Sequence, residues 1–371
     1  MAVLNEDQVM LKDMAAAWVR DRLPVSARRA VFEGEFDRGY DPAVYAEMAE
    51  MGWTGIVVPE AWGGLDFGYL SLGLVIEELG RNLVASPFIS SALGAASALR
   101  LGGTDAQRAR WLRGIADGSA IGALAVDEGA RHAPAALGVT AEAVSGGWHI
   151  RGVKRPVPDG MAADFAIVAA SAAGRTTLFV VDLAAEGVTR SALDQIDARR
   201  PAIITFDTVI GADAVLGAAG EGAALLDAIL DRVRAAVAAE MLGMATQAFE
   251  TTLDYLKTRV QFGQIIGSFQ ALQHRAAEMF AELQLARSAV EAALIAIDAD
   301  DPELPKLASL AKAIAGDTLY RISNEMVQMH GGIGMTHEHD AGLYLKSARV
   351  ADQSYGNAAY HRERWGRLSG Y

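Results

Sequence analysis

The spacing of apolar residues predicts helices in the first third of the chain. Up to about residue 120, apolar positions recur at intervals of three and four, as in residues 72–79 and 106–115, and clusters of turn residues separate these stretches. Asn5 can cap a first helix, because its side chain can accept a hydrogen bond from the backbone of the first turn. We expect Gly80 to end the helix that contains residues 72–79.

The pattern changes at about residue 121, where short β-branched or alternating runs take over. Glycine- and alanine-rich turns separate these runs at a spacing that is typical of strands. The predicted strands cover residues 121–126, 147–153, 165–170, 177–182 and 203–210. Residues 129–138 are low in sequence complexity, and we expect a surface loop there.

Helical spacing returns near residue 221 and continues to the end of the chain. It predicts one helix to about residue 259, a second over 269–298 and a third from 306 to about 329. Long, alanine-rich helices of this kind normally pack as an antiparallel bundle. The predicted organisation is therefore an N-terminal helical domain (residues 1–120), a middle β-domain (121–217) and a C-terminal four-helix bundle (218–371).

The composition narrows the possible functions. The 371 residues carry 33 Lys and Arg against 46 Asp and Glu, a formal net charge of −13, and no cysteine. Nucleic-acid binding needs clustered positive charge, so an acidic chain is a poor candidate for it. Without cysteine there are no disulfides, iron–sulfur clusters, Cys-ligated zinc sites or thiol nucleophiles. The chain contains no run of about 18 apolar residues, the length that a membrane span needs. The acidic N-terminus is unlike a signal peptide, so we expect a cytoplasmic protein.

Residues 337–340, His-Glu-His-Asp, contain the side-chain types that ligate metals. Side chains at adjacent and alternate positions rarely converge on one ion, and His330 is the one further histidine near them in sequence. We therefore expect a turn rich in polar contacts here and no metal site.

Several motifs occur in an order and at spacings that are typical of one family. They are Gly52-Trp53, Val58-Pro59-Glu60, Gly63-Gly64 and Glu77-Glu78-Leu79-Gly80-Arg81, then Asp231-Arg-Val-Arg234, Arg259-Val-Gln-Phe-Gly263, Phe269-Gln270 and Gln273, and finally Gln328-Met-His-Gly-Gly-Ile-Gly334, Thr336-His-Glu-His-Asp340 and Tyr344-Leu-Lys346. With these motifs and its order of domains, the chain resembles the acyl-CoA dehydrogenase family over essentially its whole length. The resemblance implies an α+β fold whose middle domain is β-barrel-like.

The resemblance also implies a reaction and its partners. Such proteins use FAD to oxidise an acyl-CoA thioester between its α and β carbons. A glutamate removes the α-proton, hydride passes to flavin N5, and an electron-transfer flavoprotein takes the electrons. The bundle of one subunit holds the ADP end of the FAD that is bound mainly by its neighbour, so a homo- or hetero-oligomer is expected.

The motifs suit that chemistry. Arg259 offers a charged group with several donors to a pyrophosphate, and glycines let the backbone approach a dinucleotide without a Cβ in the way. The residues that the resemblance assigns to FAD are Arg259, Gln261, Phe262, Gly263, Phe269, Gln273, Gln328, Gly331, Gly332 and Gly334.

Asp231 and Arg234 lie three residues apart and therefore share one face of a helix. Two interpretations stay open for this pair. It is either a surface ion pair worth under about 1 kcal/mol, or, as the resemblance implies, part of the site for the thioester and pantetheine of the substrate.

The usual catalytic bases of the family are missing. Tyr355 stands where most members have a glutamate, and Val233 stands where others carry the base on the long bundle helix. A tyrosine, with a pKa near ~10, is poorly matched to proton abstraction near neutral pH, and valine cannot serve at all. Alternative bases are Asp352, which precedes Tyr355 by three residues, and Glu240, which follows Val233 by seven residues and lies two turns along the same helix face.

The segments that surround the flavin ring in the family also differ here. The usual Thr-Glu-Pro run is replaced by Val126-Asp127-Glu128-Gly129 with no Gly-Ser-Asp turn after it, and the usual Trp-Ile-Thr run is replaced by Pro156-Val157-Pro158. Pro158 has neither a backbone N–H nor a hydroxyl, so its side chain can offer no hydrogen bond to flavin N5.

What is lost is what a subunit gives to its own flavin and substrate, and what is kept is what it gives to its neighbour's flavin. We therefore interpret the chain as the non-catalytic subunit of a heteromeric dehydrogenase of the sterol or acyl-CoA type, in which it completes a homologous partner's FAD site. Two alternatives stay open. One is a self-sufficient homomeric enzyme with an unconventional base, and the other is a relative that binds acyl-CoA or flavin without turnover.

Overall fold

The contacts of the chain separate it into two compact units in a computed structural model that describes residues 3–371. The bundle unit comprises the described residues up to Arg29, together with Gly73–Val84 and Arg234–Tyr371, and the sheet unit comprises Ala30–Leu72 and Ala85–Val233. The N-terminal helices are divided between these units, so the three-domain division at residues 120 and 217 stays a prediction. The first two residues of its 1–120 domain lie outside the described residues.

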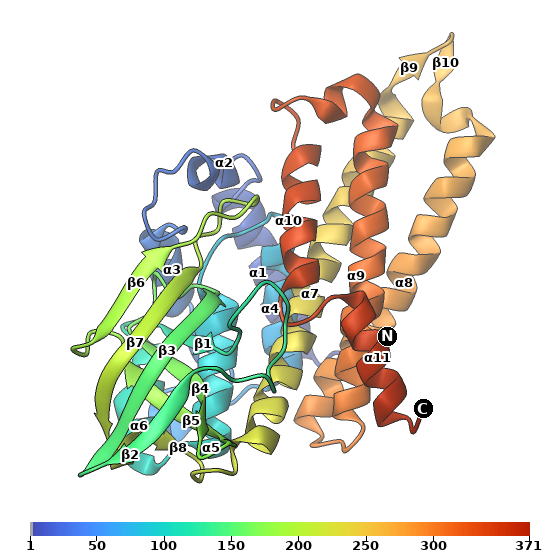
Figure 1. The fold of residues 1–371 in the computed structure, drawn as a ribbon. Coiled ribbons are helices and arrows are strands. Elements are labelled where there is room, and N and C mark those ends of the chain that lie inside the picture. The colour runs from blue at the N-terminus through green and yellow to red at the C-terminus, as the bar shows by residue number, and fades with distance from the viewer. Residues whose placement is uncertain (1–2) are drawn as a thin grey trace. The chain divides into compact units, whose positions relative to one another are not determined.

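Long helices run alongside one another in the bundle unit (Figure 1). They are α1 (Glu6–Arg22), the part of α4 (Tyr69–Arg81) from Gly73, the part of α7 (Gly222–Thr258) from Arg234, α8 (Gln270–Asp298), α9 (Leu304–His330), α10 (Ala341–Gln353) and α11 (Ala358–Leu368). Helix α9 packs against α8, α10 and α11. The three long helices predicted from the apolar spacing, α7, α8 and α9, are confirmed.

Two connections in the bundle unit matter for the site. Between α7 and α8 lie a hairpin of β9 (Val260–Gln261) and β10 (Gln264–Ile265) and the 3-10 helix η5 (Ile266–Ser268). Between α9 and α10 lies the 3-10 helix η6 (Gly331–Met335), which is followed by a short turn. Figure 1 shows the hairpin and the α9–α10 connection at the same end of the helices.

The N-terminus of α1 is capped as predicted. The Asn5 side chain accepts a hydrogen bond from the backbone N–H of Gln8 at 2.8 Å, and the Gln8 side chain accepts one from the backbone N–H of Asn5 at 3.2 Å. This reciprocal pair is a capping box, which satisfies two N–H groups that the helix itself cannot.

The prediction that Gly80 ends a helix is wrong, because α4 continues to Arg81. A Cβ at Gly80 would lie 2.3 Å from the carbonyl oxygen of Glu240, and a Cβ at Gly243 would lie 1.9 Å from the carbonyl oxygen of Glu77. These glycines therefore let the backbones of α4 and α7 touch. A tertiary contact, and not a helix stop, explains Gly80.

One eight-stranded sheet forms the centre of the sheet unit (Figure 1). Its strands follow the path β6-β7-β3-β2-β4-β5-β8, and β1 pairs in parallel with β4. The strands are β1 (Gly122–Ala125), β2 (Thr140–Val144), β3 (Gly147–Val157), β4 (Phe165–Ala172), β5 (Arg175–Asp182), β6 (Val188–Ala192), β7 (Ala202–Gly211) and β8 (Val215–Leu216). The five predicted strands, β1, β3, β4, β5 and β7, are confirmed. Strands β2 and β6 are mostly exposed and β8 has two residues, so they lack the apolar alternation that would predict them.

Shorter helices complete the sheet unit. They are α3 (Pro42–Glu50), η1 (Trp53–Gly55), η2 (Glu60–Trp62), the π-helix η3 (Ile89–Ala95), α5 (Ala96–Gly102), α6 (Asp105–Ala116) and η4 (Ala212–Ala214), while α2 (Ala27–Phe32) crosses the boundary between the units in sequence. The helix predicted at residues 106–115 is confirmed as α6. Within residues 3–371, no helix has both the length and the apolar character needed to cross a membrane.

Candidate functional site

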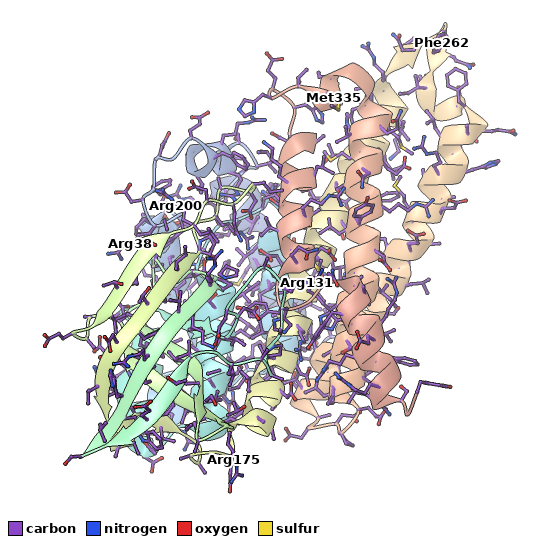
Figure 2. All side chains as sticks on the ribbon, viewed as in Figure 1. Arg38, Arg131, Arg175, Arg200, Phe262 and Met335 are labelled. Carbon is purple, nitrogen blue, oxygen red and sulfur yellow. The ribbon has the colours of Figure 1, made fainter. Side chains whose placement is uncertain are left out.

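The β9–β10 hairpin presents a cation and an apolar ring to the outside. Its turn is made by Phe262 and Gly263, both in the left-handed region with φ of 54° and 78°. The Phe262 side chain is 91% exposed and lies at the tip of the hairpin (Figure 2). Arg259 is exposed at the base of the hairpin, and its guanidinium has no hydrogen-bond or ion-pair partner among the described residues.

The α9–α10 connection contains three glycines, and the structure constrains each of them differently. Gly331 has φ 65° and ψ −137°, a conformation that strongly favours glycine. A Cβ at Gly334 would lie 2.7 Å from the carbonyl oxygen of Val327, so packing excludes a side chain there. Gly332 has neither constraint, because its φ is ordinary and a Cβ there would have no atom within 4 Å beyond those of its two chain neighbours. The open space above Gly332 is therefore available to a group from outside the chain.

The other residues predicted to bind FAD lie in the bundle unit as well. The Phe269 ring, at the start of α8, meets the Phe262 ring edge-on with centroids 6.2 Å apart. Gln273 donates its amide N–H to the carbonyl of Gly267 at 2.9 Å, and Gln328 is exposed on α9. We call the hairpin and η6 together the bundle tip. Figure 2 shows Phe262 and Met335, which is 78% exposed, at this end.

The bundle tip fits the diphosphate-bearing end of a dinucleotide. A free guanidinium is the side chain best suited to phosphate oxygens, because it donates several hydrogen bonds in a fixed plane. The space above Gly332 admits a close backbone approach, and the Phe262 ring offers a flat apolar surface. The predicted roles of the individual residues stay predictions.

The loop after β1 in the sheet unit is closed on itself. The Asp127 carboxylate lies 2.9 Å from His132 Nδ1 and accepts a hydrogen bond from the backbone N–H of Ala133 at 3.2 Å. The Glu128 carboxylate accepts from the backbone N–H groups of Gly138 and Val139 at 2.6 and 3.1 Å. These two carboxylates therefore bind the loop's own backbone and imidazole.

A buried lysine completes this closed loop. Lys154 is fully buried on β3 and donates to the carbonyl of Val126 at 2.8 Å and to Glu128 at 2.6 Å. Burial lowers the pKa of Lys154, and its contact with Glu128 opposes that shift. Burial alone would raise the pKa of Glu128, but the Lys154 hydrogen bond and the two backbone N–H groups lower it overall. Asp127, Glu128 and His132 of loop 127–139 thus form a paired network with Lys154, while Arg131 in the same loop is exposed. The loop has no helix or strand between Asp127 and Val139, as expected for residues 129–138.

Neither usual base position holds a carboxylate. Val233 is fully buried on α7 in the sheet unit, and Tyr355 is buried in the bundle unit, in the turn between α10 and α11. Tyr355 has a φ of 55°, which is unusual for an aromatic residue. Its carbonyl accepts a hydrogen bond from His361 Nε2 at 3.1 Å. Burial, together with the charges of Lys312 and Arg234, lowers the pKa of His361 to about 2, so this histidine is neutral.

Lys312 organises this turn, although no motif in the sequence singles it out. Its ammonium is fully buried and donates to the carbonyls of Ala351, Asp352 and Gly356, each at 3.0 Å. Burial lowers the pKa of Lys312 to about 7, and the charges of Asp352 and Glu240 oppose that shift. Asp352 and Glu240, the two alternative bases, therefore lie where their negative charge stabilises the Lys312 ammonium. Their catalytic role stays a prediction. In the sequence, Lys312 could have been noticed as a single lysine within the apolar face of α9, which includes Ala308 and Ala315.

Asp231 and Arg234 are both buried on α7, which makes the surface ion-pair interpretation wrong. Arg234 donates to the Tyr360 hydroxyl at 3.3 Å, and its guanidinium carbon lies 5.7 Å from the centre of the Tyr360 ring. Their role toward a substrate stays a prediction. At His337–Asp340 and elsewhere in the described part of the chain, no three His, Asp or Glu side chains lie close enough to hold a metal ion.

Comparison with known proteins decides the family. The family model of the acyl-CoA dehydrogenase N-terminal domain matches residues 5–119, and that of the acyl-CoA dehydrogenase C-terminal domain matches residues 220–368. This chain belongs to the acyl-CoA dehydrogenase family. It is thereby placed among the oxidoreductases, and both the predicted resemblance and the α+β fold class are confirmed.

Relatives of this acyl-CoA dehydrogenase cover nearly the whole chain. The acyl-CoA dehydrogenase IpdE2 of Mycobacterium tuberculosis is 31% identical over 94% of this chain and 92% of its own length. The mitochondrial isovaleryl-CoA dehydrogenase of Arabidopsis thaliana is 27% identical over 97% and 90%. A solved variant of the Tcur3481–Tcur3483 steroid ACAD is 31% identical, covers 98% of each chain and superimposes with a TM-score of 0.89.

Proposed function

We propose that this chain is the non-catalytic subunit of a heteromeric, FAD-dependent acyl-CoA dehydrogenase, and that it completes the FAD site of a homologous partner subunit. The complex removes hydrogen across the α and β carbons of an acyl-CoA thioester, and FAD, when bound, accepts the hydride. One contrast carries the proposal. The carboxylates of Asp127 and Glu128 are bound by loop 127–139 itself and by Lys154, whereas Arg259, Phe262 and Gly332 at the bundle tip are open to an outside group.

The contacts offered by the bundle tip support a role toward a partner's FAD. Arg259 is the group that binds the pyrophosphate, because it is a free guanidinium in an acidic chain. Gly331 and Gly332 let the backbone approach the dinucleotide, and the paired rings of Phe262 and Phe269 cover an apolar part of it. These side chains belong to one subunit and close a site whose remaining walls come from another.

The residues at the two base positions support the proposal that this chain does not itself abstract the proton. Removing a proton α to a thioester requires a base with a pKa near the working pH. Val233 cannot accept a proton, and Tyr355 is a buried tyrosine, a residue type whose phenol ordinarily keeps its proton up to a pH near ~10. A partner with the usual glutamate therefore supplies the base.

The relatives support the choice of assembly and substrate class. The steroid ACAD that is 31% identical to this chain carries a name that joins two proteins, Tcur3481 and Tcur3483. By likeness to it we propose a hetero-oligomer that acts on an acyl-CoA of the sterol type. We place this complex in the cytoplasm, with an electron-transfer flavoprotein as the electron acceptor.

The visible absorption spectrum tests this proposal. The chain is purified alone and after co-expression with a homologous dehydrogenase that carries the glutamate base, and flavin is quantified per chain. We expect no flavin in the folded chain alone, one flavin for every two chains in the complex, and bleaching of that flavin by acyl-CoA.

Two results would overturn the proposal. One flavin per isolated chain, reduced by acyl-CoA, would establish the self-sufficient homomer, and Asp352→Asn or Glu240→Gln should then abolish the reduction. A complex that binds acyl-CoA but never reduces its flavin would establish a relative without turnover.

A further inference from the structure

The polar turn of residues 336–340, which follows the glycines of the bundle tip, is tied down by one arginine. Arg29 Nη1 donates to the carbonyl of His337 at 2.6 Å, and Nη2 donates to the carbonyl of Glu338 at 3.2 Å and to the Asp340 carboxylate at 2.7 Å. Arg29 and the polar turn both belong to the bundle unit. One guanidinium therefore holds three acceptors within four residues.

A group of aromatic rings holds the same connection from its other side. The His330 ring, at the end of α9, lies 4.3 Å from the Tyr255 ring and 4.3 Å from the His339 ring, measured between centroids. Burial lowers the pKa of His330 and of His339, which favours the uncharged form of both rings. His339 also accepts a hydrogen bond from the backbone N–H of Ala341 at 3.1 Å, which joins the turn to the start of α10.

The 3-10 helix η6 (Gly331–Met335), which we call the glycine loop, is a single short turn between these anchors. Three of its five residues are glycine, and every residue of it except Gly334 is exposed. Ordering a free backbone costs about 1–2 kcal/mol per residue, and a loop that is already ordered pays less of this cost when a ligand binds. The anchors of the polar turn therefore bear on the affinity of the loop for a ligand.

We propose that Arg29 is a positioning residue for FAD retention, which acts by holding the polar turn and so fixing the glycine loop in the conformation that admits the dinucleotide. This inference rests on the proposed function, because the FAD concerned is the one whose site the bundle tip completes. Arg29 acts through the carbonyls of His337 and Glu338 and through Asp340, which occupy both its terminal nitrogens.

The test uses the co-purified heteromer with Arg29→Ala, Arg29→Lys and the control Arg20→Ala, which removes an exposed arginine paired with its neighbour Asp21. The two readouts are the Kd of FAD for the deflavinated complex, from flavin fluorescence, and hydrogen exchange of the amides in residues 331–340. Arg29→Ala should weaken FAD binding about tenfold, on the scale of one charge-assisted hydrogen bond, and should speed exchange in the loop. Arg29→Lys should give a Kd of FAD and an exchange rate between those of the wild type and Arg29→Ala. An ammonium keeps the attraction to Asp340 but cannot donate to two carbonyls with the geometry of a guanidinium. Arg20→Ala should change neither readout.

A further variant separates the carboxylate from the carbonyls. Asp340→Asn keeps both carbonyl contacts of Arg29 and should weaken FAD binding less than Arg29→Ala does. Equal FAD affinity and equal loop exchange in wild type and Arg29→Ala complexes would overturn the positioning role. If Arg29→Ala does not assemble, Arg29→Lys decides the question by the same two readouts.

Arg259→Ala in the same assay distinguishes failure of this inference from failure of the proposed function. If Arg259→Ala releases FAD while the Arg29 variants do not, the positioning role alone is wrong. If Arg259→Ala also leaves FAD affinity unchanged, the bundle tip does not contribute to a FAD site, and the proposed function fails with it.

Discussion

Loop 127–139 and the bundle tip both follow regular elements of the same chain, yet the carboxylates of the loop are paired within the chain and the cation of the tip is not. Asp127 and Glu128 in the loop and Lys154 on β3 are bound to partners within the chain. At the bundle tip, Arg259 is free and Gly332 faces open space. A buried polar group without a partner costs about 1–3 kcal/mol, which explains why the part-buried carboxylates of the loop are paired within the chain. A surface that another molecule completes keeps its polar groups open.

The largest expected effect comes from removing the buried cation that holds loop 127–139. Lys154→Met removes the buried cation that joins Glu128 to the Val126 carbonyl. We expect a loss of about 3 kcal/mol in the free energy of unfolding, measured in urea, because a carboxylate is left without its partner. The control Lys306→Met breaks an exposed pair with Glu303 and should cost under about 1 kcal/mol. Equal losses in the two variants would show that the loop is not held by its internal pairs.

The next largest expected effect is on the pH dependence of stability. As the pH falls, His361 in the bundle unit should lower the free energy of unfolding at a higher pH than Glu128 in loop 127–139 does. The unfolded chain, in which the His361 pKa is near ~6.5, takes up a proton that the folded chain, with a pKa of about 2, does not. The free energy of unfolding therefore falls as pH drops below about 6.5, by up to about 1.4 kcal/mol per pH unit. Since the pKa of Glu128 is lowered, its contribution is fully present above pH ~4.5 and is lost only in stronger acid.

Unfolding in urea between about pH 7 and pH 5 checks this order. His361→Gln should give a flatter pH profile than the wild type, because glutamine takes up no proton. An unchanged slope in the variant would assign the acid sensitivity to other groups.

Removing the free cation of the bundle tip tests the other side of the comparison. Arg259→Ala should raise the Kd of FAD for the assembled complex about 10- to 100-fold, which is the loss of one or two charge-assisted hydrogen bonds to a phosphate. Lys257→Ala is the matched control, because Lys257 is an exposed cation two residues away that pairs with Asp254 at 3.8 Å. Similar losses for both variants would point to the general field of positive charge and against a specific contact.

Gly332→Ala has the smallest expected effect and is the most selective test. The new methyl group meets nothing in this chain, so the free energy of unfolding should stay within about 0.5 kcal/mol of the wild type. FAD affinity of the complex should still fall a few-fold, because the methyl group occupies the space through which a dinucleotide approaches. Gly366→Ala, at another open position on α11, should leave FAD affinity unchanged.

The elements of the fold that depend on local pattern could be predicted from the sequence. The cap at Asn5, the long helices α7, α8 and α9 and the five strands with apolar runs follow from residues that are neighbours in sequence. Gly80 could not be predicted in the same way, because the reason for it is the carbonyl of Glu240 on another helix. The exposed strand β2 has no apolar alternation to identify it.

The site divides along the same line. The residues of the bundle tip are contiguous motifs, so the sequence could single them out together. Lys312 and Arg29 could not be found in this way, because each is defined by carbonyl groups of a distant segment, and a carbonyl carries no sequence signal. Such residues become visible when the backbone that they bind has been placed.

The exposed hairpin has a consequence for how a cell handles this chain. An orphan copy, made without its proposed partner, displays the Phe262 ring at 91% exposure beside Val260 and Ile265, which are 54% and 45% exposed. Strands β9 and β10 have two residues each, too short an edge to recruit further strands into fibrils. Chaperones and proteases act on such apolar surfaces, so we expect copies without the proposed partner to be degraded. If the proposed heteromer forms, we expect the abundance of this chain to depend on the synthesis of its partner as well as on its own.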